Sequence, residues 1–215
     1  MLTKRDIEIL NILTKAVRVL TVPQIARTWW PDSPNGIRVA ENRLRALAAE
    51  KLLYFERAPA HPELLLEMPV ASWRPGAADP DFGAVAYSLQ SRWREHPILT
   101  PCVSATEGAA NRFGGHCNRP PRSVERTHDI HMARVYLLYR LRHPELLKDW
   151  IFEEQIKSER RLARREPAYG EKLPDVILRT SSQTRVIEFG GAYGKDKLIA
   201  FHGYCKERSF PYELW

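Results

Sequence analysis

Residues 37–51 decide the fold of the first part of the chain, and they read IRVAENRLRALAAEK. Apolar side chains recur there at the spacing of one helical face, at Ile37, Ala40, Leu44, Leu47 and Ala48. Arg38, Asn42 and Arg45 fall on a different face, because each residue advances a helix by about 100°. We therefore predict an amphipathic helix with a polar and partly cationic side.

Two shorter helices are predicted before this one. Thr3 followed by Asp6 resembles a capping box, and apolar residues continue at helical spacing to Val17. Thr21 is a second N-cap candidate, with Pro23 in the first turn, where its missing N–H costs nothing. The second helix is expected to end near Trp30, because residues 31–36 (PDSPNG) are a concentrated turn signal.

A hairpin is predicted after the long helix. Residues 52–57 (LLYFER) have the composition of a strand, and residues 63–69 (ELLLEMP) are expected to return beside it. Three helices followed by a hairpin is the element order of a winged helix-turn-helix, whose third helix enters the major groove of DNA. Arginine reads guanine there and asparagine reads adenine. We therefore expect base contacts from Arg38, Asn42 and Arg45, and phosphate contacts from Arg43 and Lys51.

The whole chain is expected to be an α+β protein in two domains. We assign residues 1–95 to the winged helix, 96–125 to a linker and 126–215 to a small α/β domain. Residues 72–80 and 111–122 are loop-rich, and residues 85–89 are compatible with a strand or a helix. The second domain is expected to hold helices at 131–142 and 195–208, a charged helix or arm at 148–165, and strands at 175–178, 185–189 and 210–215.

Charge favours a nucleic acid as the partner, and the helix-turn-helix pattern makes double-stranded DNA the expected one. The formal net charge is +7, and a polyanion attracts such a protein regardless of sequence. The basic run at 157–165 (KSERRLARR) is either a solvated helix or a clamp for the DNA backbone. The three cysteines are far apart and suggest reduced thiols, and no apolar run reaches the length needed to cross a membrane. We expect a cytoplasmic protein.

Two carboxylates of the second domain are predicted to lie close together. Asp175 opens one strand and Glu188 closes the next, so antiparallel pairing brings them to one edge of the sheet. Such a pair can hold Mg²⁺ and activate water against a phosphodiester, with Glu153 or Glu154 completing the ligand set. The alternative is that these are ordinary strands with acidic ends.

The Pro174-Asp175 and Glu188 pattern resembles the PD-(D/E)xK phosphodiesterase superfamily, and the chain as a whole resembles the replication-relaxation family of plasmid and mobile-element proteins. The resemblance is carried by short segments in the same order along the chain: Arg5-Asp6, residues 44–53, residues 104–109 (SATEGA), residues 128–131 (HDIH), Pro174-Asp175, residues 187–189, Lys197 and Tyr204. It implies a winged helix joined to a truncated or degenerate restriction-endonuclease-like domain.

One position departs from the nuclease pattern. Catalytic members of the superfamily have a lysine two residues after the strand carboxylate, and this chain has Gly190 there. Lys195 or Lys197 would have to migrate from the following helix to replace it. We therefore expect a DNA-binding protein of a plasmid or mobile element, acting in transcriptional control, replication or transfer, with an inactive nuclease-like domain.

Two alternatives stay open at this stage. One is a Mg²⁺-dependent nuclease that uses Asp175, Glu188 and a migrated lysine; the other is an adaptor that docks a partner protein on DNA. No cofactor is expected to be needed for DNA binding, and Mg²⁺ only for the nuclease. A homodimer is compatible with each of these functions.

Overall fold

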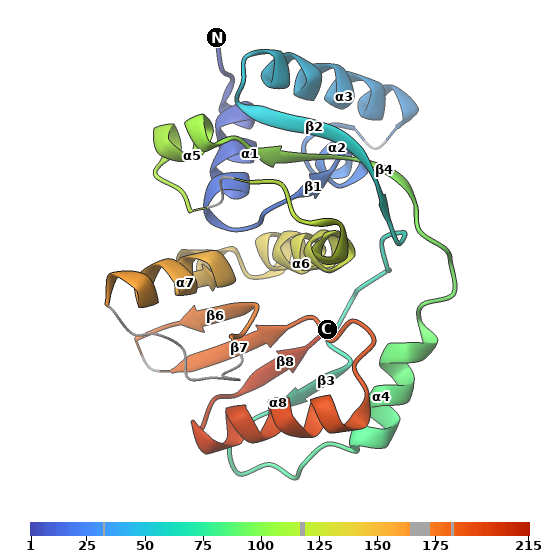
Figure 1. The fold of residues 1–215 in the computed structure, drawn as a ribbon, viewed down its shortest axis with the longest axis vertical. Coiled ribbons are helices and arrows are strands. Elements are labelled where there is room, and N and C mark those ends of the chain that lie inside the picture. Colours follow the sequence, from blue (N-terminus) through green and yellow to red (C-terminus); the bar gives the residue numbers. More distant parts are fainter. Residues whose placement is uncertain (32, 117–118, 164–172, 182) are drawn as a thin grey trace. The chain divides into compact units, whose positions relative to one another are not determined.

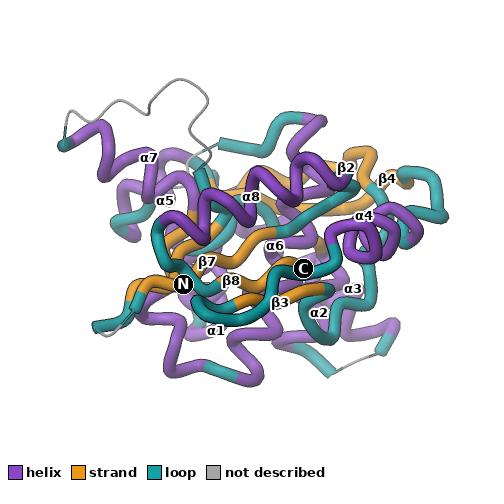
Figure 2. The backbone as a smooth tube through the Cα atoms, turned by 90° about the horizontal axis from the view of Figure 1, so that it is seen from below, coloured by secondary structure: helices purple, strands orange, loops and turns teal. Residues whose placement is uncertain are grey.

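The computed structural model describes residues 1–31, 33–116, 119–163, 173–181 and 183–215, and it is an α+β structure (Figures 1 and 2). The chain divides into two units, each built from two stretches. Unit 1 consists of Met1–Glu63 and His96–Leu137, and unit 2 of Leu64–Glu95 and Leu138–Trp215. The sequence analysis assigned one continuous stretch to each domain, whereas here the chain leaves unit 1 after residue 63 and returns at residue 96.

The first two helices of unit 1 begin at the predicted caps. Helix α1 spans Lys4–Lys15, and its capping box joins Thr3 and Asp6: the Asp6 amide donates to the Thr3 hydroxyl at 3.2 Å, and the Thr3 amide donates to the Asp6 carboxylate at 2.7 Å. Helix α2 spans Val22–Trp29, and Thr21 forms the same arrangement with Gln24. Both helices were predicted from short-range sequence signals, and both predictions are confirmed.

Helix α3 spans Pro34–Ala49, so it begins before residue 37, where it was expected to start. The Ser33 hydroxyl accepts a hydrogen bond from the Gly36 amide at 3.0 Å, and Pro34 lies in the first turn. The residues interpreted as a turn are therefore partly the N-terminal cap of the helix. Three residues of the predicted apolar face, Ala40, Leu44 and Leu47, are buried. Ile37, predicted to belong to the same face, is 38% exposed, and Ala48 is half-buried.

The sheet of unit 1 pairs different segments from those expected. Strand β2 (Leu53–Ala60) lies antiparallel to β4 (Ile98–Ala105), and β1 (Leu20–Thr21) pairs with the other edge of β4. The predicted return strand at 63–69 is wrong, because those residues form no strand. Strand β4 instead matches β2 over its full length and buries Cys102, Val103 and Ala105, whereas Leu65 of the predicted strand is 92% exposed.

Two further helices complete unit 1 and lie partly in the expected linker. Helix α5 spans Glu107–Phe113 and ends at Gly114, whose positive φ of 67° closes the helix. Helix α6 spans Ser123–Arg142, so it begins before residue 131, where the sequence analysis placed its start. The boundary between the two units falls within this helix.

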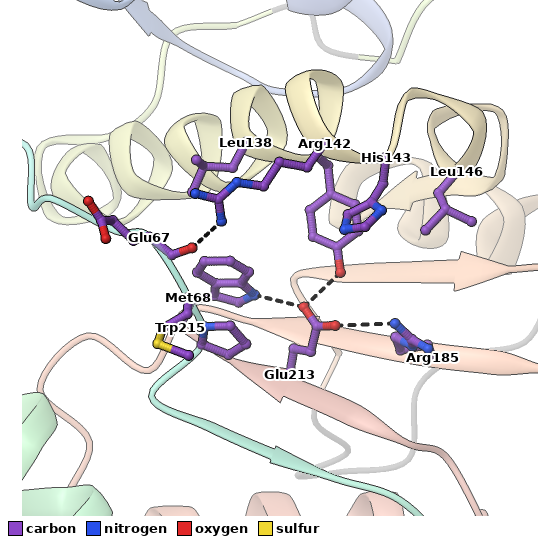
Figure 3. A pocket seen from close by; sticks show the side chains of 11 residues that line it. Glu67, Met68, Leu138, Arg142, His143, Leu146, Arg185, Glu213 and Trp215 are labelled. Atoms are coloured by element: carbon purple, nitrogen blue, oxygen red, sulfur yellow. Dashed lines mark hydrogen bonds and ion pairs between the residues drawn. The ribbon is translucent and has the colours of Figure 1, made fainter.

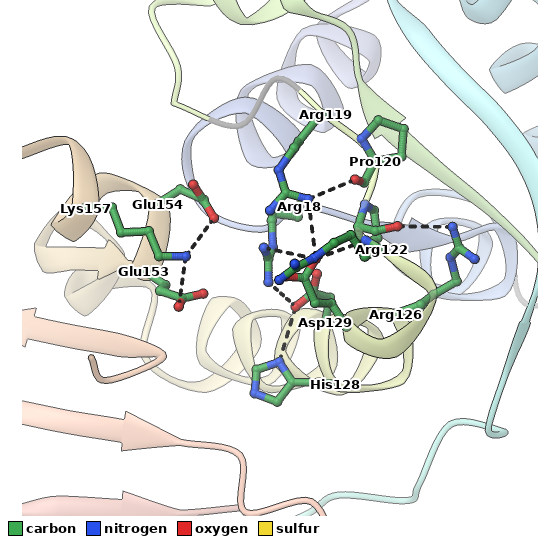
Figure 4. A network of polar contacts seen from close by, with 12 residues as sticks. Arg18, Arg119, Pro120, Arg122, Arg126, His128, Asp129, Glu153, Glu154 and Lys157 are labelled. Carbon is green, nitrogen blue, oxygen red and sulfur yellow. Dashed lines mark hydrogen bonds and ion pairs between the residues drawn. The ribbon is translucent and has the colours of Figure 1, made fainter. Parts of the chain in front are cut away.

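A network of ion pairs fastens α6 to the turn after α1 (Figure 4). Arg18, which is 8% exposed, donates to Asp129 at 2.8 Å and lies 3.7 Å from Glu125. Glu125 also accepts from Arg122 at 2.5 Å and from Arg119 at 3.3 Å. Hydrogen bonds from Arg122 outweigh the opposing effect of burial and, with Arg18 and Arg119, lower the pKa of Glu125 from 4.5 to about 2.

We predict that this network makes the stability of unit 1 depend on acid pH. A lowered pKa in the folded state means that the Glu125 carboxylate contributes stability above pH 4.5, and that this contribution disappears as the pH falls toward 2. Replacing Glu125 by Gln should lower stability by roughly 2 kcal/mol at pH 7, with a difference that shrinks below pH 4. Urea denaturation at several pH values measures this, and a difference that does not change with pH contradicts it.

The described residues of unit 2 include a five-stranded sheet with two helices packed against one face. Its strands lie in the order β3 (Ala71–Trp73), β8 (Tyr212–Leu214), β7 (Thr184–Glu188), β6 (Val176–Arg179) and β5 (Trp150–Phe152), with β7 and β8 parallel and the other neighbours antiparallel. Helices α4 (Phe82–Ser91) and α8 (Lys195–Glu207) contribute Leu89, Leu198 and Phe201 to a core with Val186 and Leu214.

Two segments whose secondary structure the sequence left undecided lie in unit 2. Residues 85–89 belong to helix α4. The stretch expected as a charged helix or arm, 148–165, begins at the end of the 3₁₀ helix η1 (Pro144–Asp149) and contains strand β5 and helix α7 (Glu153–Leu162). Arg164 and Arg165 of the basic run lie outside the described residues. Within the part of the chain that the structure describes, no helix is both long enough and apolar enough to cross a bilayer.

Candidate functional site

Helix α3 presents the three predicted base-reading side chains on its exposed surface. Arg38, Asn42 and Arg45 are all exposed, while the opposite side of the helix is buried in unit 1. Arg38 donates to the side chain of Asn35 at 2.8 Å, so it lies along the surface of the first turns. Lys51, a predicted phosphate contact, is exposed just after the helix with a φ of 60°.

Arg43 has a different environment from the other arginines of α3. Its Nε and Nη2 atoms donate to the two carboxylate oxygens of Asp6 at 3.0 and 2.7 Å, and the Asp6 side chain is only 1% exposed. Burial disfavours the charged form of Asp6, but hydrogen bonds from Arg43 and Thr3 outweigh it and lower the pKa of the carboxyl. Arg43, which was expected to hold a phosphate, therefore joins α3 to the start of α1.

Replacing Asp6 by Asn should test this connection. The variant loses the charge that pairs with Arg43 while keeping the shape of the side chain, so we expect a loss of about 2–4 kcal/mol of stability. The urea midpoint of unfolding measures the effect. Glu107→Gln, which removes an exposed acidic group from the first turn of α5, serves as the control and should change stability little. Equal effects of the two substitutions would contradict the assignment.

Arg45 is held by two neighbours that the sequence analysis did not single out. Its Nε and Nη2 atoms donate to Glu41 Oε1 at 3.2 and 2.7 Å, and its guanidinium carbon lies 4.1 Å from the centre of the Phe55 ring. Arg57 of β2 approaches the same Glu41 oxygen at 3.6 Å. The i,i+4 spacing of Glu41 and Arg45 is a readable sequence signal, whereas the contact with Phe55 depends on how β2 packs beside α3.

The acidic pair of unit 2 meets as strand pairing predicts. Val176 pairs with Ile187 across β6 and β7, which places Asp175 opposite Glu188. The Asp175 amide donates to Glu188 Oε2 at 3.3 Å, and the Phe189 amide donates to Asp175 Oδ2 at 2.9 Å. The two carboxylates therefore lie at one edge of the sheet and already accept hydrogen bonds from the backbone.

A tyrosine that the sequence patterns did not indicate also contacts this acidic pair. Tyr193, in the turn between β7 and α8, donates its hydroxyl to Glu188 Oε1 at 2.6 Å. Burial and the nearby Glu188 and Asp175 carboxylates raise the pKa of Tyr193 far above its usual value, so the phenol stays protonated and remains a donor. The ammonium group of Lys197 lies over the same ring, 3.7 Å from its centre.

Among the other residues expected at this site, Glu153 lies beside the pair, because its amide donates to the Asp175 carbonyl oxygen at 2.9 Å. Lys195 is exposed in the first turn of α8, and Glu154 lies 3.2 Å from Lys157, which also pairs with Glu153 at 3.0 Å (Figure 4). Gly190 stands where a nuclease would have lysine. A Cβ atom at this position would lie 2.8 Å from Leu89 Cδ1 and 3.1 Å from Leu214 Cδ1, so buried side chains would have to move to admit a lysine.

This geometry does not fit a resident divalent cation. Hard cations need several open oxygen ligands, whereas Glu188 is 0% exposed and both of its oxygens accept hydrogen bonds from the protein. Across the described residues, no group of three or more His, Cys, Asp or Glu side chains is placed to hold a metal ion.

We predict that the Tyr193 hydroxyl stabilises unit 2. Tyr193→Phe removes a buried hydrogen bond to a carboxylate and should lower stability by about 1.5–3 kcal/mol, visible as a lower melting temperature. Addition of Mn²⁺ or EDTA should leave the melting temperature of the wild-type protein unchanged. Stabilisation by Mn²⁺ that is abolished in Asp175→Asn would show instead that the pair binds metal.

Unit 2 also contains a cavity of about 180 Å³ (Figure 3). Its floor is the carboxylate of Glu213, which accepts from Tyr139 at 2.7 Å, from the Trp215 indole at 3.2 Å and from Arg185 at 3.2 Å. Burial and the proximity of Glu213 raise the pKa of Tyr139 above its usual value. The polar groups of this floor are engaged with one another, and the cavity contains none of the residues predicted to be functional.

No family model, curated protein or solved structure matches this chain.

Proposed function

We propose that this protein binds double-stranded DNA through helix α3 of unit 1. The support is the order of the elements, α1, β1, α2, α3, β2 and β4, with the strands arranged β1-β4-β2. The recognition helix of a helix-turn-helix enters the major groove. Here the antiparallel strands β2 and β4 follow α3, and the short strand β1, which lies between α1 and α2, pairs with β4. The single observation that carries the proposal is the exposure of Arg38, Asn42 and Arg45 together on α3.

The chemistry of these side chains matches base edges. Arginine donates two parallel hydrogen bonds to guanine O6 and N7, and asparagine pairs with adenine N6 and N7. The net charge of +7 adds an attraction to the phosphate backbone that does not depend on sequence. Lys51, exposed after α3, is suited to such a phosphate contact. None of these contacts needs a metal ion.

The resemblance to the replication-relaxation family supports a wider role. We propose that the protein acts in transcriptional control, replication or transfer of a plasmid or mobile element, and that unit 2 is a nuclease-like domain without catalysis. Gly190 in place of the expected lysine, and the hydrogen bond from Tyr193 to Glu188, both support the second part. Unit 2 is then available for docking a partner protein or a second copy of the chain.

Substitutions on α3 test the proposal. We expect Arg38→Ala, Asn42→Ala and Arg45→Ala each to weaken binding to a preferred duplex by roughly 1–3 kcal/mol, or about fivefold to a hundredfold. Because bound phosphates release counterions, affinity should also fall as salt rises, with a slope on logarithmic axes of about −0.9 for each phosphate contact. Fluorescence anisotropy with labelled duplexes at several salt concentrations gives both quantities.

Arg112→Ala is the matched control, because Arg112 is an exposed arginine of α5 in the same unit. It removes the same charge without altering α3. Binding that falls equally in Arg112→Ala and Arg45→Ala would point to general attraction alone. Duplex affinity that is unchanged in all three α3 variants would refute the proposed function.

A further inference from the structure

Arg45 differs from the other exposed polar residues of α3 because it is held from two directions. Glu41 accepts hydrogen bonds from its Nε and Nη2 atoms at 3.2 and 2.7 Å, and the Phe55 ring supports its flat face at 4.1 Å. Its side chain is nevertheless 52% exposed, so solvent still reaches the guanidinium. This arginine is both fixed in direction and accessible.

The N–H donors of Arg45 that Glu41 does not engage define what this arginine can recognise. A guanidinium carries five N–H donors, of which Glu41 takes one from Nε and one from Nη2. The Nη1 atom and the second hydrogen of Nη2 form a planar fork on the side away from Glu41. Guanine offers O6 and N7 as paired acceptors at the spacing of such a fork.

Glu41 is suited to hold this arginine as an ionised acceptor. It is 23% exposed and lies within 3.6 Å of a second guanidinium, that of Arg57 on β2. The hydrogen bond from Arg45, opposed by burial and assisted by the charges of Arg45 and Arg57, lowers the pKa of Glu41, so the side chain is an ionised acceptor at neutral pH. An arginine already ordered before binding loses less conformational entropy when it meets its ligand.

We infer that Glu41 and Phe55 are positioning residues that orient Arg45 to read a guanine in the major groove. The inference rests on the proposed DNA binding of α3 and adds the source of its sequence preference. A carboxylate on a DNA-facing helix repels phosphates, and the inference explains what Glu41 contributes there in return: it orients Arg45. Arg45 makes the base contact, and Glu41 acts through it.

Two opposite effects make this assignment testable. Loss of the Glu41 charge reduces repulsion from phosphates, so binding to arbitrary DNA should stay equal or become tighter. Loss of the same carboxylate releases Arg45, so the preference for guanine should fall. A purely electrostatic role of Glu41 changes only the first quantity.

The experiment begins by selecting preferred duplexes from a randomised double-stranded library with the full-length wild-type protein. Anisotropy then gives the affinity for the selected duplex, for single-base replacements of each of its guanines, and for an unrelated duplex. The variants are Glu41→Gln, Phe55→Leu and Arg45→Lys. Glu50→Gln is the control, because it removes a charge from the exposed C-terminal end of the same helix.

The expected result has four parts. One guanine should contribute about tenfold or more to wild-type affinity. Arg45→Lys, which keeps the charge and loses the planar fork, should abolish that preference. Glu41→Gln and Phe55→Leu should reduce it by about threefold or more, while affinity for the unrelated duplex stays within about twofold of wild type or rises. Glu50→Gln should keep the full preference.

Other outcomes distinguish a failure of the positioning role from a failure of DNA binding itself. Duplex binding in which Glu41→Gln and Phe55→Leu retain the full guanine preference overturns the positioning role and leaves the DNA-binding function intact. The positioning role is likewise overturned if the selected sites contain no guanine whose contribution to affinity depends on Arg45. If the wild-type protein binds no duplex at all, the proposed function fails and this inference fails with it.

Discussion

The buried carboxylate of Asp6 is the interaction on which the arrangement of unit 1 depends. It accepts hydrogen bonds from the amide and the hydroxyl of Thr3, at 2.7 and 2.8 Å, and from two nitrogens of Arg43. A charge removed from water in this way is tolerated only when it is fully paired. One side chain therefore caps α1 and fixes the middle of α3, and the orientation of α3 determines which of its side chains face solvent.

The arginines of α3 consequently have different roles despite their identical chemistry. Arg43 and Arg45 are two positions apart, which places them about 200° apart around a helix. Arg43 faces Asp6 and holds the fold together, while Arg45 faces outward and rests on Glu41 and Phe55. Counting basic residues along the helix thus overstates the charge that is free to meet a ligand, and the pairing of each guanidinium decides its function.

In unit 2 the surrounding hydrogen-bond donors likewise decide how the acidic pair is engaged. Antiparallel pairing of β6 and β7 brings Asp175 and Glu188 together, as in a metal-binding site. The chemistry of the pair is decided by the turn that follows, because Tyr193 returns its hydroxyl to Glu188 and the tight packing around Gly190 disfavours a lysine there. Adjacent carboxylates are thus compatible with very different functions, according to the donors that surround them.

The sequence by itself determined the features that depend on neighbouring residues. The caps at Thr3 and Thr21, the buried stripe of α3 and the pairing of the strands at 175–178 and 185–189 all follow from hydrogen bonds and periodicity over short distances along the chain. Only the tertiary structure decided that β4 pairs with β2, that Arg43 binds Asp6, and that Phe55 supports Arg45. These contacts join residues that are many positions apart, so their choice depends on the packing of whole elements, which no local pattern records.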